Sequence, residues 1–395
     1  MPVDERPWSG TPASGLHERG ARMLTVCNAC RYCEQFCPVF PAMERCGTFD
    51  TRALDYLANL CHNCGECLYA CQYAPPHEFG IDIPRTLTEI RLQSYEDCCW
   101  PRALGAAFRR NNLATGLGLA ALLMVAMSAW TSFASPGALT RGDRSADFYA
   151  VMPHGAMVTL FGGVFGFVLI ALGVGLARFR RQIRQEAGSG LRLEAERAAR
   201  NPVSHPAPSF HALRDVLTLR HLHVAGADCV TAEETRRPWR RWFHHCTFYG
   251  FMLCFASTSV AAVYHLFFGW AAPYAYTSLP VILGTLGGAG LLIGPAGLLV
   301  VRTTRDPALG VPGREGLDDS FVALLFVTSL TGLVLLALRH QPAMPVLLVV
   351  HLGAVLALFL TLPYGKFVHG LYRTAALVKF ARETRDGHEP GSRVS

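Results

Sequence analysis

Two cysteine ladders near the start of the chain are the residues best suited to chemistry. Each ladder has the spacing C-x2-C-x2-C-x3-C, and the second repeats the first at a displacement of 34 positions. Three thiolates this close together, with a fourth three residues on, suit an iron–sulfur cubane, whereas zinc sites usually take two separate C-x2-C pairs. We therefore expect two [4Fe–4S] clusters rather than zinc. The ladders are Cys27, Cys30, Cys33 and Cys37, and then Cys61, Cys64, Cys67 and Cys71.

The spacing also predicts how the ligands are divided between the clusters. In proteins with two such runs, the fourth cysteine of each run binds the cluster of the other run. This rule requires the two ladders to pack face to face, and residues 48–60 between them have leucines at helical spacing. The expected sets are Cys27, Cys30, Cys33 and Cys71 for one cluster, and Cys61, Cys64, Cys67 and Cys37 for the other. We expect Cys46, Cys98 and Cys99 to be packed thiols outside both sets.

Composition indicates that the rest of the chain lies in a membrane. The 395 residues are 51% hydrophobic and only 16% charged, which is a low charged fraction for a soluble protein. Six runs contain no Asp, Glu, Lys or Arg, and each is near the roughly 20 residues that a membrane-spanning helix needs. The expected spans are 113–135, 151–177, 246–268, 279–301, 321–338 and 345–362.

The basic residues predict the orientation of these spans. With six spans, both termini share one side of the membrane, and that side holds 33 of the 36 Lys and Arg residues. The positive-inside rule then places both termini, the cysteine ladders and the loop at 179–243 in the cytoplasm, with the spans in the cell inner membrane. The net charge of +7 follows from this asymmetry, so it indicates no nucleic-acid partner. Within the loop, 213–223 is expected to be an amphipathic helix. The basic surface of the loop could receive an acidic soluble partner or lie against anionic membrane lipids.

Histidines in and beside the spans form the second candidate site. A cluster domain joined to membrane helices needs a route for electrons into the bilayer, and haem b with two axial histidines on facing helices is the usual one. We therefore expect one or two haem b groups. The candidate ligands are His154, His244, His245, His265, His351 and His369.

Helical spacing sorts these histidines into two facing pairs. His351 and His369 are 18 residues apart, so on one straight sixth helix they would face the same way, roughly 27 Å apart. His244 and His265 lie near one face of the third span, which runs antiparallel to the sixth. The expected pairs are His244 with His369 near the cytoplasmic end and His265 with His351 near the opposite end.

Two histidines remain as alternatives to these four. His154 begins the second span on the non-cytoplasmic side and could replace His265 or His351. His245 could replace His244, because Pro363 could kink the sixth helix and shift its register.

The order of these features resembles a known family. The sixth span reads His351-Leu-Gly and then Pro363-Tyr-Gly-Lys-Phe-Val-His369, and the third span begins Arg240-Arg-Trp-Phe-His244-His245. These segments resemble the haem-bearing helices of the membrane subunits of nitrate reductase and heterodisulfide reductase. Over nearly its full length, the chain is similar to the tricarballylate (citrate) utilization protein B family.

The resemblance implies a function that the chain performs with a partner. Such proteins re-oxidise the reduced FAD of a separate, cytoplasmic tricarballylate dehydrogenase and pass the electrons on to quinone. The sequence agrees, since it has no strand-linked G-x-G-x-x-G and no hydrolytic or substrate-oxidising constellation. The alternatives are the membrane subunit of a heterodisulfide-reductase-like complex and a non-enzymatic iron–sulfur redox sensor.

The expected fold is mainly α, with an N-terminal helical ferredoxin-type domain followed by a six-helix transmembrane haem b bundle. The expected divisions are 1–112 for the cluster domain, 113–178 for the first two spans, 179–243 for the Arg-rich loop, 244–369 for the last four spans and 370–395 for a cytoplasmic tail.

Overall fold

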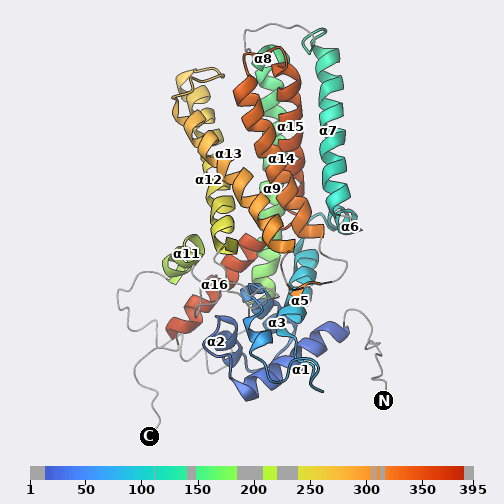
Figure 1. Cartoon of the computed structure of the whole chain (residues 1–395), viewed down its shortest axis with the longest axis vertical. Coiled ribbons are helices and arrows are strands. Elements are labelled where there is room, and N and C mark those ends of the chain that lie inside the picture. Colours follow the sequence, from blue (N-terminus) through green and yellow to red (C-terminus); the bar gives the residue numbers. More distant parts are fainter. Residues whose placement is uncertain are drawn as a thin grey trace.

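The protein is almost entirely helical. This computed structural model describes residues 14–110, 112–139, 148–184, 208–219, 239–303, 306, 309–311 and 316–386. Within these residues the chain forms 15 helices and no strands, which confirms the predicted mainly α fold. Figure 1 shows long helices side by side in a bundle, with the shorter N-terminal helices gathered beyond one end of it.

Six helices are long and apolar enough to cross a membrane, as the charge-free runs predict. Their outer faces expose large apolar side chains, among them Phe133 at 88% and Phe267 at 78%, as lipid-facing surfaces do. These helices are those of a multi-pass membrane protein. They are α7 (Asn112–Ala134), α9 (His154–Gln182), α12 (Trp239–Phe268), α13 (Leu279–Thr303), α14 (Gly316–Leu338) and α15 (Met344–Thr361).

The bundle is assembled around close contacts between neighbouring helices. Helices α12 and α13 approach most closely, because a Cβ atom added to Gly287 would lie 2.8 Å from the backbone oxygen of Gly250. Small residues allow such close approach in lipid, where packing rather than the hydrophobic effect drives helix association. Helix α13 packs on α14, α14 on α15, and α15 on both α7 and α9. A short helix, α8 (Phe148–Val151), precedes α9.

The N-terminal domain is built around one nearly buried helix. Helix α3 (Thr51–Leu60) lies within the predicted range 48–60, and its Leu54, Leu57 and Leu60 are fully buried. Asp50 caps its first turn by accepting a hydrogen bond of 2.8 Å from the Ala53 amide. The other helices of this region are α1 (Ser14–Cys30), α2 (Val39–Glu44), α4 (Glu66–Tyr69), α5 (Ile83–Cys98) and α6 (Arg102–Arg110).

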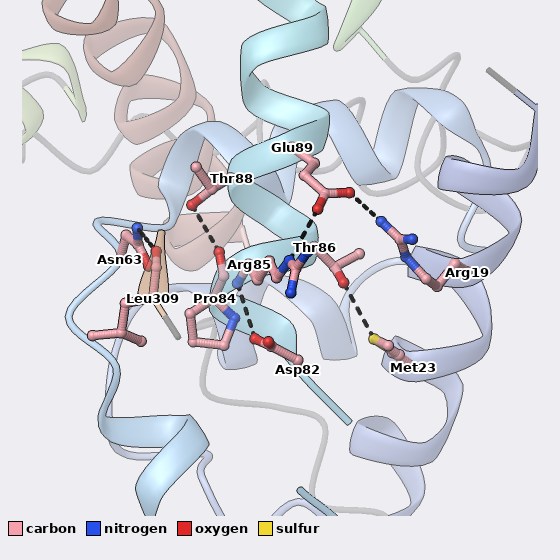
Figure 2. Close-up of polar contacts among 10 residues, drawn as sticks. All are labelled: Arg19, Met23, Asn63, Asp82, Pro84, Arg85, Thr86, Thr88, Glu89 and Leu309. Carbon is pink, nitrogen blue, oxygen red and sulfur yellow. Dashed lines mark hydrogen bonds and ion pairs between the residues drawn. The ribbon is translucent and has the colours of Figure 1, made fainter. Parts of the chain in front are cut away.

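Helix α5 is held by polar contacts along its first turns (Figure 2). Asp82 accepts a hydrogen bond of 3.1 Å from the amide of Arg85, and Thr88 donates one of 2.7 Å to the carbonyl of Pro84. Glu89 pairs with Arg85 and with Arg19 of α1, so these charges join α5 to α1. Helices α1, α3 and α5 therefore form one packed unit that carries both cysteine ladders.

The prediction that His351 and His369 share one straight helix is wrong. Helix α15 ends at Thr361, because Pro363 has no backbone N–H to continue the hydrogen-bond ladder. A separate helix, α16 (Val368–Asp386), begins one residue before His369.

Helix α16 packs on the rest of the protein and is not a free tail. Its Tyr372 stacks on Phe179 of α9, with ring centroids 4.5 Å apart and planes at 6°. Its Glu383 accepts a hydrogen bond of 2.8 Å from the Tyr56 hydroxyl of α3. Residues 370–386 thus join the N-terminal domain to the bundle, and Figure 1 shows α16 at the junction of the two.

The long loop contributes one described helix, α11 (Pro208–Leu217), which packs against α16. The amphipathic helix predicted at 213–223 therefore starts earlier than expected, and its part from 220 onward lies outside the described residues.

Candidate functional site

The first cysteine set lies at the surface of the N-terminal domain. Cys27 and Cys30 end helix α1, and Cys33 follows in the turns after it. Burial, followed by the nearby Cys71, Cys33 and Cys30 sulfurs, raises the pKa of the Cys27 thiol to about 12. Cys71 of the second ladder therefore faces the three cysteines of the first. All four line one cavity of about 290 Å³.

The second cysteine set is more deeply placed. Burial, followed by the nearby Cys61 and Cys64 sulfurs, raises the pKa of the Cys37 thiol well above its usual value. Burial, followed by the nearby Cys37, Cys61, Cys64 and Cys33, likewise raises the pKa of the Cys67 thiol well above its usual value. These four residues line a second, much narrower cavity of about 20 Å³ beside Val39, Phe40, Ile83 and Leu87. The structure thus brings together both of the crossed sets that the spacing predicts.

A local turn shapes the second set. Gly65 has a φ of 89°, a left-handed conformation that glycine adopts without strain. A Cβ atom at this position would also lie 2.8 Å from Leu309, which belongs to the segment between α13 and α14. Asn63 donates a hydrogen bond of 3.2 Å to the Leu309 carbonyl (Figure 2), and Tyr69 donates one of 2.5 Å to Asp306. The bundle therefore contacts the second ladder directly.

The donor chemistry of the eight cysteines fits iron–sulfur clusters. All eight are free thiols. The surroundings of Cys27, Cys33, Cys37 and Cys67 raise the thiol pKa and so disfavour an uncompensated thiolate, which positively charged iron would stabilise. In the part of the chain that the structure describes, no three His, Cys, Asp or Glu residues converge closely enough for a single metal ion. The sulfurs of the first set lie around a cavity of about 290 Å³ rather than around a point, which suits a cubane better than zinc.

The spare cysteines lie outside both sets. Cys46 donates to the carbonyl of Ala42, and Cys98 to the side chain of Gln182. Cys99 donates to the carbonyl of Glu96.

One histidine pair has the geometry of a bis-histidine site. His244 of α12 and His369 of α16 face each other with ring centroids 6.2 Å apart and planes at 84°. Because a metal–imidazole bond is about 2 Å long and the ring centre lies about 1 Å behind its nitrogen, two imidazoles on one iron place their centroids roughly 6 Å apart. The two residues therefore fit the axial positions of a haem.

The nitrogens of this pair are also suitably placed. Nδ1 of His369 lies 2.5 Å from the carbonyl of Lys366, a contact that orients the ring and leaves Nε2 for a ligand. Burial, followed by Lys366 and His244, lowers the pKa of His369 to about 3, so the ring is neutral, as a metal ligand must be. Nδ1 of His244 is buried without a hydrogen-bond partner among the described residues, which a metal bond would satisfy.

His245 does not face this pair. Its ring lies parallel to that of Tyr249 on the same helix, at 5.7 Å and 4°. Of the two adjacent histidines, the structure thus directs His244 toward His369.

The histidine pair observed at the far end of the bundle differs from the predicted one. His265 stacks on His154, with ring centroids 3.8 Å apart and planes at 28°, and Tyr149 lies beside both rings. His351 instead contacts α14, where its Nδ1 lies 3.1 Å from the Thr331 hydroxyl. The expected pairing of His265 with His351 is therefore wrong, because the faces of α12 and α15 at this depth point to different neighbours. Rings 3.8 Å apart do not fit an iron between them.

Three arginines for which the sequence predicted no role converge on the second cysteine set. Arg373 donates a hydrogen bond of 3.2 Å to the carbonyl of Leu60, and Arg91 donates to the carbonyl of Cys61. Arg240 contacts the carbonyls of His62 and Asn63, both at 3.4 Å. A signal was present, since Arg240 and Arg373 are each four residues from a candidate histidine.

A ferredoxin-type cysteine domain seated on six apolar helices defines the protein as a membrane-bound iron–sulfur protein with an electron-transfer role. Two family models match, citrate utilization protein B over residues 107–390 and the citrate utilization protein B Fer4-like domain over residues 20–97. The chain is 46% identical over 372 residues to citrate utilization protein B of Escherichia coli, covering 94% of this chain and 93% of that protein. The chain belongs to the citrate utilization protein B family. No solved structure matches it.

Proposed function

We propose that this protein carries electrons from the reduced FAD of a cytoplasmic tricarballylate dehydrogenase, or a dehydrogenase of a similar tricarboxylate such as citrate, to the quinone pool. The observation that carries the proposal is the order of sites along the molecule. The first cysteine set is open to solvent at Cys30, the second lies at the junction with the bundle, and the pair of His244 and His369 follows.

Each part of this route has a separate role for the chain's own residues. When bound, two [4Fe–4S] clusters and one haem b supply one-electron carriers between a two-electron donor and quinone. The two cysteine sets hold their clusters as thiolates and keep the inner one dry. His244 and His369 hold the haem from two different helices, so its position depends on how α16 packs. The loop 179–243 and both termini lie in the cytoplasm, on the side that carries 33 of the 36 basic residues.

The surface beside the first set suits a transient protein partner. Tyr32 is 70% exposed and Phe79 is 42% exposed, and Tyr32 lines the same cavity as Cys30. Exposed aromatic residues are common at protein interfaces. The flavoprotein would therefore approach the end of the molecule farthest from the membrane.

Within the described residues, the alternatives lack the features that they need. A heterodisulfide-type reductase would require a further gathered cysteine site, whereas Cys46, Cys98 and Cys99 make separate local contacts. A redox sensor would require an element that responds to the clusters. Helix α16 contacts both the cluster domain and the bundle, but it also carries His369 of the ring pair, so it fits a haem-binding helix better than a responding element.

The test is the order in which the centres become reduced. In purified protein, the reduced flavoprotein should bleach the cluster absorbance first and then produce the alpha band of reduced haem b. His369→Ala should leave the clusters reducible while abolishing haem reduction, and His245→Ala should change neither. Haem reduction by the donor at an unchanged rate in the His369→Ala protein would contradict the proposed route.

A further inference from the structure

Helices α12 and α16 carry the same arrangement of an arginine and a histidine in opposite sequence order. Arg240 precedes His244 by four residues, and Arg373 follows His369 by four residues. Residues four apart lie on one helix face, one turn of about 5 Å along the axis. On both helices, the histidine belongs to the facing ring pair, and the arginine reaches the backbone of the second cysteine ladder.

The arginine contacts surround Cys61. Arg373 donates to the carbonyl of Leu60, just before this cysteine, and Arg240 lies against the two carbonyls just after it. Arg91 donates to the carbonyl of Cys61 itself and is only 8% exposed. Three guanidinium groups from three helices therefore contact the backbone on both sides of Cys61. Two of these helices, α12 and α16, also carry the histidine pair.

The guanidinium of Arg373 lies partly buried beside the second set, where it donates to the carbonyl just before Cys61. A guanidinium stays protonated at neutral pH, so it brings a fixed positive charge to this set. At the first set, by contrast, Arg31 between Cys30 and Cys33 is exposed, and its guanidinium donates to the carbonyl of Asn28.

A cubane with four thiolate ligands is negatively charged, and reduction adds one more negative charge. A fixed positive charge nearby stabilises the reduced form more than the oxidised form, and partial burial strengthens the effect. Buried or partly buried guanidinium groups at one cluster, against an exposed and solvent-screened one at the other, should therefore separate their reduction potentials.

We propose that Arg240 and Arg373 are positioning residues that raise the reduction potential of the cluster held by Cys37, Cys61, Cys64 and Cys67 above that of the outer cluster. One electron leaves the outer cluster and enters the inner one, and no proton moves in this step, because guanidinium groups do not release protons at neutral pH. Transfer from the outer cluster to the inner one, which lies on the side of His244 and His369, is then favoured energetically. The inference rests on the iron–sulfur part of the proposed function.

The test uses full-length proteins that retain one cluster. Cys30→Ala removes a ligand of the outer cluster, and Cys64→Ala removes a ligand of the inner one. The midpoint potential of the remaining cluster is measured by redox titration with electron paramagnetic resonance. In the Cys30→Ala background, Arg373→Gln and Arg240→Gln should each lower this potential by about 59 mV, equivalent to a tenfold change in a one-electron equilibrium. In the Cys64→Ala background, neither should change it.

Two further variants separate charge from structure. Arg45→Gln is the matched control, because Arg45 also joins the cluster domain to α16, through a hydrogen bond of 2.9 Å to Thr384, away from the cysteine sets. It should leave both potentials unchanged. Arg373→Lys keeps the positive charge and should retain most of the wild-type potential.

Several outcomes would overturn the proposal. These are equal shifts in both backgrounds, a shift of the same size in Arg45→Gln, and a fall in Arg373→Lys as large as that in Arg373→Gln. If Arg373→Gln loses its remaining iron and sulfide, the midpoint potential of Arg240→Gln becomes the test. The same loss in both variants would overturn the proposal and assign the arginines to cluster assembly instead. The titration needs no flavoprotein, haem or quinone, so a failed donor reaction would contradict the proposed function and leave this result standing.

Discussion

His244 of α12 and His369 of α16 face each other with ring centroids 6.2 Å apart, although α16 is a separate helix and not a continuation of the sixth span, α15. Helix α16 leaves the membrane bundle, stacks Tyr372 on α9 and contacts α3 of the cluster domain. The same helix thus positions one member of the ring pair and contacts the backbone of the second cysteine ladder through Arg373. The geometry of the candidate haem site therefore depends on how the two parts of the protein pack together.

The first prediction concerns the metal content. Anaerobically purified protein should contain about eight iron and eight labile sulfide per chain in its clusters, because two cubanes hold four of each. Cys64→Ala should lose about half of the labile sulfide. Cys46→Ala is the control, since Cys46 is a buried thiol outside both sets, and it should retain both clusters. Stoichiometric zinc without labile sulfide would rule out the clusters.

The second prediction concerns the number of haems and their ligands. Pyridine haemochrome analysis should find about one haem b per chain, because among the histidine pairs of the described residues only His244 and His369 have a separation suited to iron. His244→Ala and His369→Ala should each remove this haem. His245→Ala should retain it, because that ring lies against Tyr249. Two haems per chain, one of which is lost with His154→Ala, would contradict the conclusion that the stacked rings of His154 and His265 hold no iron.

The third prediction concerns orientation in the membrane. A reporter fused after Ser395 should report the cytoplasm, and one inserted beside Gly142 should report the other side, because the basic residues are concentrated on the side of both termini. Six spans require the two signals to be opposite. Matching signals at the two positions would mean that one of the six helices does not cross the membrane.

The fourth prediction concerns the attachment of the cluster domain to the bundle. Tyr372→Ala should destabilise this junction by about 3 kcal/mol or more, because it removes a large aromatic ring, 2% exposed and stacked on Phe179. Limited proteolysis should then separate the cluster domain from the bundle faster than in the wild type. Tyr32→Ala, at a residue that is 70% exposed, should leave the rate unchanged. Equal rates for both variants would show that α16 does not secure the domain.

Local patterns in the sequence determined much of this protein. The cysteine spacing predicts both crossed sets, because a cubane dictates how closely three thiolates must follow one another and leaves the fourth position to the other run. The six spans follow from the lengths of the charge-free runs, because the thickness of the bilayer sets the length of a spanning helix. Helix α3 follows from the leucine spacing between the ladders. Each of these features depends on residues that are neighbours in sequence.

Tertiary structure alone decided which residues face one another. Pro363 ends the sixth helix, so His369 occupies a new helix whose direction helical spacing could not supply. His265 meets His154 rather than His351, because the face that a helix presents at a given depth depends on its rotation and tilt against its neighbours. Arg240 and Arg373 likewise approach Cys61 only because the N-terminal ends of α12 and α16 lie beside the cluster domain. Contacts of this kind join residues far apart in the chain, and packing selects them.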